Sequence, residues 1–173
     1  MRFVDFLKTT VLLSAAAATV LAALTVAGAG GNSGVIVAAI GWWLVAGLIG
    51  LMLGRRAEVN PPIARLLAGA KATNALPEQR PAAALLNRLW PLLLYTLGFG
   101  ALAFLAPQIP GIAAGLPIIL SLYWRRQEAA VAAIEERDGA QFYIEKTSPL
   151  RPISLVRATG FRAIRPQQLN GAV

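Results

Sequence analysis

The chain has 173 residues, of which 57% are hydrophobic and 14% charged, with a formal net charge of +8 and neither cysteine nor histidine. Soluble domains carry roughly a quarter charged residues, so this composition argues against a soluble fold for most of the length. The missing cysteine and histidine exclude disulfides, thiolate nucleophiles, the usual zinc ligands and imidazole acid–base chemistry.

The charged residues are distributed unevenly along the chain. All 16 Lys and Arg and all 8 Asp and Glu lie outside two stretches, 9–54 and 89–124. Each stretch is strongly apolar and is interrupted once by a short turn-forming segment, and about 20 apolar residues suffice to cross a bilayer. We therefore predict an all-α polytopic membrane protein with four transmembrane helices arranged as two hairpins.

The first transmembrane hairpin is expected at residues 1–54. A short amphipathic lead-in precedes a span over about 9–29, and a glycine-rich turn leads to a second span over about 35–53. The first apolar run resembles a signal peptide, with a basic start and small residues at its end. Its length is that of a full span and a second span follows at once, which favours a retained helix.

Residues 55–88 are expected to form a cytoplasmic loop that contains an interfacial helix. Asn60 suits the N-cap of such a helix and Pro61 suits its first turn. Apolar residues from Ile63 to Ala70 then recur at helical spacing. We expect this short helix to lie on the membrane surface, with Arg65 and Lys71 available to lipid headgroups.

The second transmembrane hairpin is expected at residues 89–126, with spans over about 89–106 and 109–124. This hairpin is short for two untilted spans, so a complete crossing and a re-entrant hairpin both stay open. Flanking arginine pairs and aromatic residues favour the complete crossing. Pro117 falls inside the last span and predicts a kink there.

The remaining residues, 127–173, are expected to form a cytoplasmic C-terminal region. No helix breaker occurs before Gly139, so the last span is predicted to continue as a helix up to this glycine. Residues 141–147 and 153–159 then have the pattern of a β-hairpin. Because a lone hairpin is marginally stable in water, it needs the membrane-proximal helices or a partner to pack against.

The basic flanks predict the orientation in the membrane. Both opposite-side turns are uncharged, whereas the N-terminus, the central loop and the C-terminal region are basic, so all three are expected in the cytoplasm of a bacterial cell, at the plasma (inner) membrane. The same basic residues favour anionic lipid headgroups over nucleic acid as a partner. The residues expected to contact anionic lipid are Arg55, Arg56, Arg125 and Arg126.

Small residues four positions apart predict sites of close helix packing. Ala46, Gly50 and Gly54 form such a stripe on the second span, and Gly111 and Gly115 form another on the last span. Small residues let two helix backbones approach closely within a membrane. The stripes therefore serve either packing within one chain or the docking of a partner or a second copy.

Aromatic residues within the spans have two interpretations. They either line a ligand cavity or fill space beside the alanine-rich first span, and space filling is the simpler interpretation. The indole N–H groups then need hydrogen-bond partners, for which Ser14 or Thr19 are available. The residues considered as cavity lining are Trp42, Trp43, Tyr95 and Ser121.

The inventory of side chains leads to no catalytic, metal or cofactor site. The acids Glu135, Glu136 and Asp138 are interpreted as a solvated helix end. No charge lies within the expected spans, which argues against a proton- or cation-coupled transporter. The sequence favours a non-enzymatic accessory or assembly subunit of a membrane complex. The alternatives are a small homo-oligomeric transporter or channel for an apolar or zwitterionic solute and, third, a membrane enzyme acting on lipid.

Overall fold

The computed structural model describes residues 1–55, 61–73, 81–145 and 153–159, and the chain is mostly helical. Its elements in chain order are α1 (Phe3–Gly28), α2 (Ser33–Leu53), α3 (Pro61–Ala68), β1 (Lys71–Thr73), α4 (Pro81–Ala101), the 3₁₀ turn η1 (Leu102–Phe104), α5 (Gln108–Ala113), α6 (Gly115–Asp138), β2 (Ala140–Ile144) and β3 (Leu155–Thr159).

Within these described ranges, three helical segments are long and apolar enough to cross a membrane: Phe3–Gly28, Ser33–Leu53 and Leu85–Phe104. The fourth expected span is divided between α5 and α6. The first span begins at Phe3 and not near residue 9, because the amphipathic lead-in continues the helix of α1.

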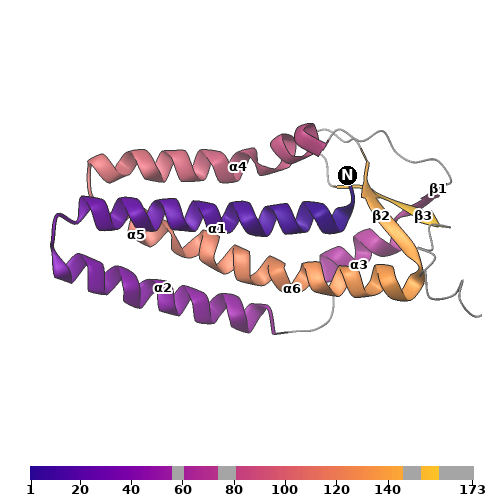
Figure 1. Cartoon of the computed structure of the whole chain (residues 1–173), viewed down its shortest axis with the longest axis horizontal. Helices are drawn as coiled ribbons and strands as arrows, with labels where there is room; N and C mark the ends of the chain where they lie inside the picture. Colours follow the sequence, from indigo (N-terminus) through magenta and orange to yellow (C-terminus); the bar gives the residue numbers. More distant parts are fainter. Residues whose placement is uncertain (56–60, 74–80, 146–152, 160–173) are drawn as a thin grey trace, which may run out of the picture.

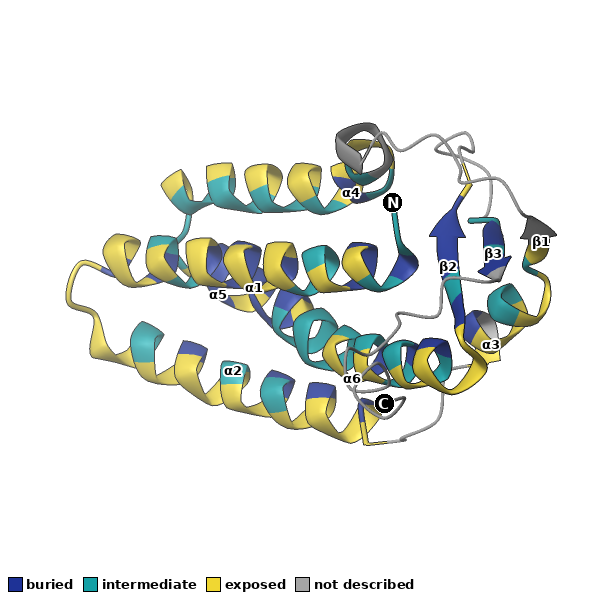
Figure 2. Cartoon of the chain, turned by 45° about the vertical axis from the view of Figure 1, so that its right-hand side comes forward, coloured by how far each residue is buried: buried dark blue, intermediate teal, exposed yellow. Residues whose placement is uncertain are grey.

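The helices form a layer in which the two hairpins interleave (Figure 1). α1 packs mainly against α6 and also against α4 and α5, while α2 packs against α6 and α5. The α5–α6 segment therefore lies between α1 and α2, which follow one another in the chain but share no extensive contact. The outer faces of α2 and α4 are left exposed (Figure 2).

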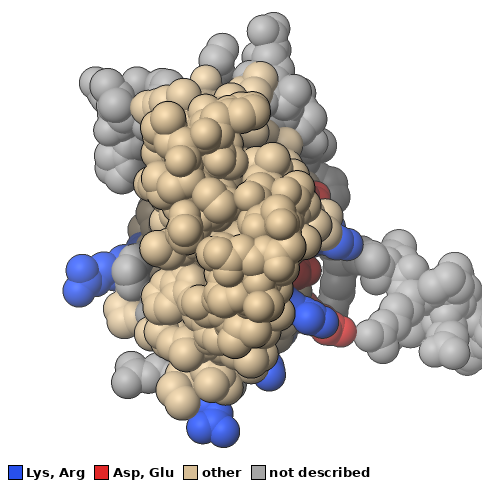
Figure 3. Space-filling view, turned by 90° about the vertical axis from the view of Figure 1, so that its left-hand side faces the viewer, with Lys and Arg blue, Asp and Glu red and all other residues tan. Residues whose placement is uncertain are grey.

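The two interhelical turns lie at the same end of this layer. In the first turn Gly30 and Gly31 have positive φ angles of 54° and 85°, and Asn32 caps α2 by accepting hydrogen bonds from two backbone amides. A Cβ atom at Gly28 would lie 3.0 Å from Cβ of Pro107, so the second turn contacts the end of α1. The described residues on this end are uncharged, and Lys and Arg project only at its margins (Figure 3).

The opposite end carries a three-stranded sheet in the order β1-β3-β2. α6 continues without a break to Gly139, whose φ of 58° ends the helix as predicted. β2 and β3 then pair antiparallel, as expected of the hairpin, with Phe142 opposite Arg157. β1, which the sequence did not reveal, pairs parallel with β3 and places Ala72 opposite Arg157.

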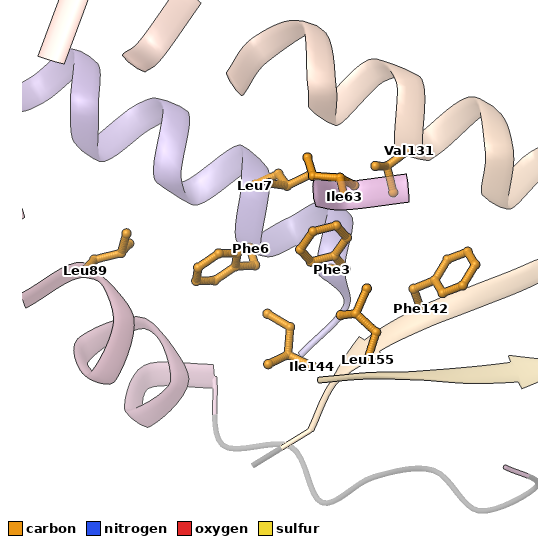
Figure 4. Packing of buried hydrophobic residues seen from close by; sticks show 9 residues of the cluster. All are labelled: Phe3, Phe6, Leu7, Ile63, Leu89, Val131, Phe142, Ile144 and Leu155. Atoms are coloured by element: carbon orange, nitrogen blue, oxygen red, sulfur yellow. The ribbon is translucent and has the colours of Figure 1, made fainter. Parts of the chain in front are cut away.

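A core of nine buried apolar residues joins this sheet to the helices. We call it the sheet-end core, and Figure 4 shows its side chains converging around Phe3. It draws on α1, α3, α4, α6, β2 and β3, so six elements far apart in the sequence meet here. Its members are Phe3, Phe6, Leu7, Ile63, Leu89, Val131, Phe142, Ile144 and Leu155.

The helix expected on the membrane surface forms, but its apolar face packs on protein. α3 begins at Pro61, as the start signal predicted, while Asn60 lies outside the described residues. Ile63 is buried in the sheet-end core, and Leu66, Leu67 and Ala70 pack against it. The apolar stripe of α3 therefore packs on the protein, because an amphipathic helix buries its stripe on an adjacent apolar surface.

Candidate functional site

The helix that should form the last span is broken at Ala114, between α5 and α6. Proline lacks an amide hydrogen and its ring clashes with the carbonyl four residues earlier. For Pro117 this carbonyl is that of Ala113, the last residue of α5. The interruption thus lies at Ala114, one turn before the proline, and Pro117 itself lies in the first turn of α6, where its missing amide costs little.

Three consecutive carbonyl oxygens at this break accept hydrogen bonds from aromatic side chains. The donors come from α2 and α4, so the break connects these helices to α5. The bonds run from Trp43 Nε1 to Gly111 O at 2.8 Å, from Trp42 Nε1 to Ile112 O at 2.9 Å, and from Tyr95 Oη to Ala113 O at 2.8 Å. We call residues 111–115 with these three donors the helix break.

Side chains of α1 and α2 can approach the helix break closely because its own residues are small. A Cβ atom at Gly111 would lie 3.0 Å from Cγ2 of Thr25 on α1, and one at Gly115 would collide with the indole of Trp42. Ala113 and Ala114 form a small buried cluster with Leu21 of α1. Trp43, Tyr95 and Phe99 pack around that cluster.

Of the four residues considered as cavity lining, the structure brings three together. Ser121 lies further along α6 and donates to the carbonyl of Ile118 in its own helix. The partners expected for the indoles were wrong. Thr19 donates to Ala15 O, and the buried hydroxyl of Ser14 has no hydrogen-bond partner among the described residues. The sequence did contain a sign that Ala113 O needs a side-chain donor. Pro117, four residues later, has no amide hydrogen to donate to this carbonyl.

The small-residue stripe on α2 faces α6 of the same chain. Ala46 is fully buried. A Cβ atom at Gly50 would lie 3.0 Å from Leu122 Cβ and 3.1 Å from Ile119 Cα. Since this side of α2 is occupied by α6, it is not the free face that would meet a partner.

At the sheet end, an ion pair joins the N-terminus, α6 and the sheet. Arg2 donates to Glu135 Oε2 at 2.7 Å, and the amide of Phe142 donates to Glu135 Oε1 at 2.9 Å. The amide of Ile144 donates to Met1 O at 3.0 Å. The hydrogen bond to Glu135 raises the pKa of the Arg2 guanidinium above its usual value, so Arg2 keeps its positive charge.

This ion pair corrects the interpretation of the acidic cluster as a solvated helix end. Glu136 and Asp138 are exposed, but Glu135 is buried and only 6% of its side chain is accessible. The sequence could not reveal this, because its two partners come from the first residues of the chain and from β2. In the described part of the chain, no group of His, Cys, Asp and Glu side chains suits a metal ion.

The three candidate membrane spans and the small sheet at the charged end are the features of a helical membrane protein with a sheet domain at one end. Comparison of the chain with protein-family models, with curated proteins and with solved structures finds no match. Its function is therefore inferred from its own geometry.

Proposed function

We propose that this protein is a non-enzymatic integral membrane protein that acts as an accessory or assembly subunit of a membrane complex. On this proposal the helices anchor the sheet domain, and the domain meets a partner at the membrane. The orientation follows the basic flanks, with the sheet domain in the cytoplasm and α5–α6 completing a fourth span.

The observation that carries the proposal is the contrast between the spans and the sheet domain. Within 9–54 and 89–124 the chain has no charged residue. Most hydroxyl side chains there donate to a carbonyl of their own helix, as Thr25 does to Leu21 O and Thr96 to Leu92 O. The spans thus hold no charged groups of the kind that bind or move ions, whereas the sheet end carries the ion pairs Arg2–Glu135 and Arg137–Asp138.

Continuous helices connect the two parts, which suits a subunit that positions a partner. α6 runs as one helix from the break at Ala114 into the sheet end. α1 begins inside the sheet-end core and continues through the bundle. A partner bound to the sheet domain would therefore be held at a fixed distance and angle from the membrane.

Native mass spectrometry of the tagged protein, extracted with its lipids in polymer discs, tests this proposal. A foreign protein present at fixed stoichiometry is the expected result. A photo-crosslinking residue at the exposed Arg137 should then capture that protein, while the same residue at Leu97 on the exposed face of α4 should capture mainly lipid. A homo-oligomer without a second protein would overturn the proposal.

Deleting residues 127–173, which would remove the C-terminal region, cannot test whether that region binds the partner. The deletion would remove Val131, Phe142 and Leu155 from the sheet-end core. Loss of binding would then report unfolding and not a lost contact. Substitutions of exposed residues on the last turn of α6, at Glu136, Arg137 and Asp138, avoid this problem.

One observation favours the alternative, a small transporter or channel. Discontinuous helices often form the substrate sites of transporters, near the middle of the membrane. Here the carbonyls at the break are already bonded to Trp42, Trp43 and Tyr95, which supports a structural role for it. Liposome flux of a zwitterionic solute that disappears in a folded Trp43→Ala variant would favour the transporter instead.

A further inference from the structure

Two of the described arginines are paired with acidic side chains of the protein itself. Arg2 is paired with Glu135 at 2.7 Å, and Arg137 is paired with Asp138 at 2.8 Å. Both pairs belong to the sheet end. These two guanidinium groups therefore have counter-ions supplied by the protein itself.

A second group lies where α2 and α6 meet, and we call it the arginine notch: Arg55, Arg125 and Arg126. All three side chains are exposed. Among the residues that the structure describes, no carboxylate pairs with any of them. Like charges at neighbouring positions repel one another, so an anion that binds them relieves an unfavourable interaction.

The close approach of the two helices brings Arg126 to the end of α2, where Arg55 follows Gly54, and Arg125 directly precedes Arg126 in the chain. A Cβ atom at Gly54, the last residue before Arg55, would lie 3.2 Å from Cγ of Arg126 and 3.4 Å from the carbonyl oxygen of Leu122. The aliphatic part of Arg126 therefore lies across the end of α2. Any larger residue at position 54 would displace it.

The notch is also at the level where lipid headgroups are expected. The first charge-free stretch ends at Gly54 and the second at Trp124, so both helices reach their first charges here. Tyr123 and Trp124 pack edge to face just before the arginines, with ring centroids 5.3 Å apart. Aromatic rings followed by basic residues are typical of the membrane–water interface.

We infer that the arginine notch binds the phosphate of an anionic phospholipid, between the ends of α2 and α6. Guanidinium groups bond phosphate oxygens in pairs, with a geometry that ammonium groups lack. The lipid would complete the contact between α2 and α6 on the headgroup side. This inference holds whether or not the protein also has a protein partner.

The test measures binding of phosphatidylglycerol to the full-length protein in detergent, by native mass spectrometry against phosphatidylcholine of the same chain length. The double variant Arg55→Gln, Arg126→Gln keeps the aliphatic stems and should weaken binding of phosphatidylglycerol about tenfold or more, since each basic residue near the surface contributes on the order of 1 kcal/mol. Phosphatidylcholine binding should not change.

The matched control removes the same number of charges from the sheet end. Arg65→Gln with Arg137→Gln changes two exposed arginines outside the notch and should leave phosphatidylglycerol binding within about twofold of the parent. Circular dichroism shows whether each variant keeps its helix content.

Three results would overturn the inference. The first is an equal loss in both double variants, which would show a diffuse charge effect. The second is equal retention of phosphatidylglycerol and phosphatidylcholine by the parent. The third is displacement of the lipid by glycerol phosphate at the same concentration, which would identify the ligand as a free anion.

Discussion

The sheet-end core and the helix break both join elements that are far apart in the sequence, but different interactions hold them. The sheet-end core contains large apolar side chains such as Phe3 and Phe142, together with one buried ion pair. The helix break contains glycine and alanine, and its contacts are hydrogen bonds from indole and phenol groups to backbone carbonyls.

The difference follows from the surroundings of each region. Next to water, burial of apolar surface is the main source of stability. Between membrane helices that source is absent, because lipid is as apolar as leucine, and close packing and hydrogen bonding take its place. An unbonded carbonyl is also far more costly in lipid than in water. Substitutions that remove side-chain volume should therefore lower the free energy of unfolding most at the sheet end. Within the bundle, substitutions that add volume or remove a hydrogen-bond donor should lower it.

Phe142→Ala should have the largest effect. Phe142 is 3% exposed in the sheet-end core, and such a truncation costs about 3–5 kcal/mol of the free energy of unfolding. The measurement is chemical unfolding in micelles followed by circular dichroism. Phe104→Ala is the control, since Phe104 is 94% exposed at the uncharged end. Equal losses for the two variants would contradict the assignment of Phe142 to a water-excluded core.

Glu135→Ala should come next. It leaves the buried amide of Phe142 without an acceptor and Arg2 without a counter-ion. The unpaired amide alone costs about 1–3 kcal/mol. Because the side chain of Arg2 is 41% exposed, its charge is partly screened, and Glu135→Gln, which keeps an acceptor, should cost less than about 1 kcal/mol. The same unfolding experiment ranks the two variants, and a larger loss for glutamine than for alanine would contradict this account.

Gly50→Ala tests close packing within the bundle. The added methyl group meets Leu122 and the backbone of Ile119, so α2 and α6 must move apart, at a cost of about 1–3 kcal/mol. Gly47→Ala on the same helix is the matched control. Its methyl group meets nothing within 4 Å, and the stability of this variant in micelles should be equal to or slightly above that of the parent.

Much of the helical layout could be predicted from the sequence, because it depends on local patterns. Charge-free apolar runs predicted α1, α2 and α4, and the lack of a breaker before Gly139 predicted the residue at which α6 ends. The two strands after it were expected at residues 141–147 and 153–159, on either side of a proline-containing turn, and β2 and β3 overlap these ranges. These signals lie within short windows, and no information about distant residues is needed to interpret them.

The arrangement of these elements could not be predicted in the same way. β1 has three residues and pairs with a strand more than eighty positions later, so no local period reveals it. In a uniformly apolar helix such as α2, the pattern does not show which side meets protein and which meets lipid. Which side of α2 faces the protein decides how the two hairpins interleave. It also decides which carbonyls the indoles of Trp42 and Trp43 can reach. The burial of Glu135 depends on distant residues too.

Tyr95→Phe should have the smallest effect and is the sharpest test of the helix break. The substitution removes one hydroxyl and leaves the ring in place against Phe99. Ala113 O then has no replacement from its own helix, because the residue four positions later is Pro117. Hydrogen bonds between membrane helices contribute about 0.6 kcal/mol on average and at most about 1.7 kcal/mol.

Tyr123→Phe is the matched control for this last measurement. It removes the same group from a tyrosine that packs on Trp124 near the charged end and bonds to no other described residue through its hydroxyl. In SDS-titrated micelles, only Tyr95→Phe should lower the midpoint of helix unfolding. If the two variants unfold alike, the carbonyl of Ala113 has found water or another donor. The break would then be open to polar ligands, which would favour the transporter over the subunit.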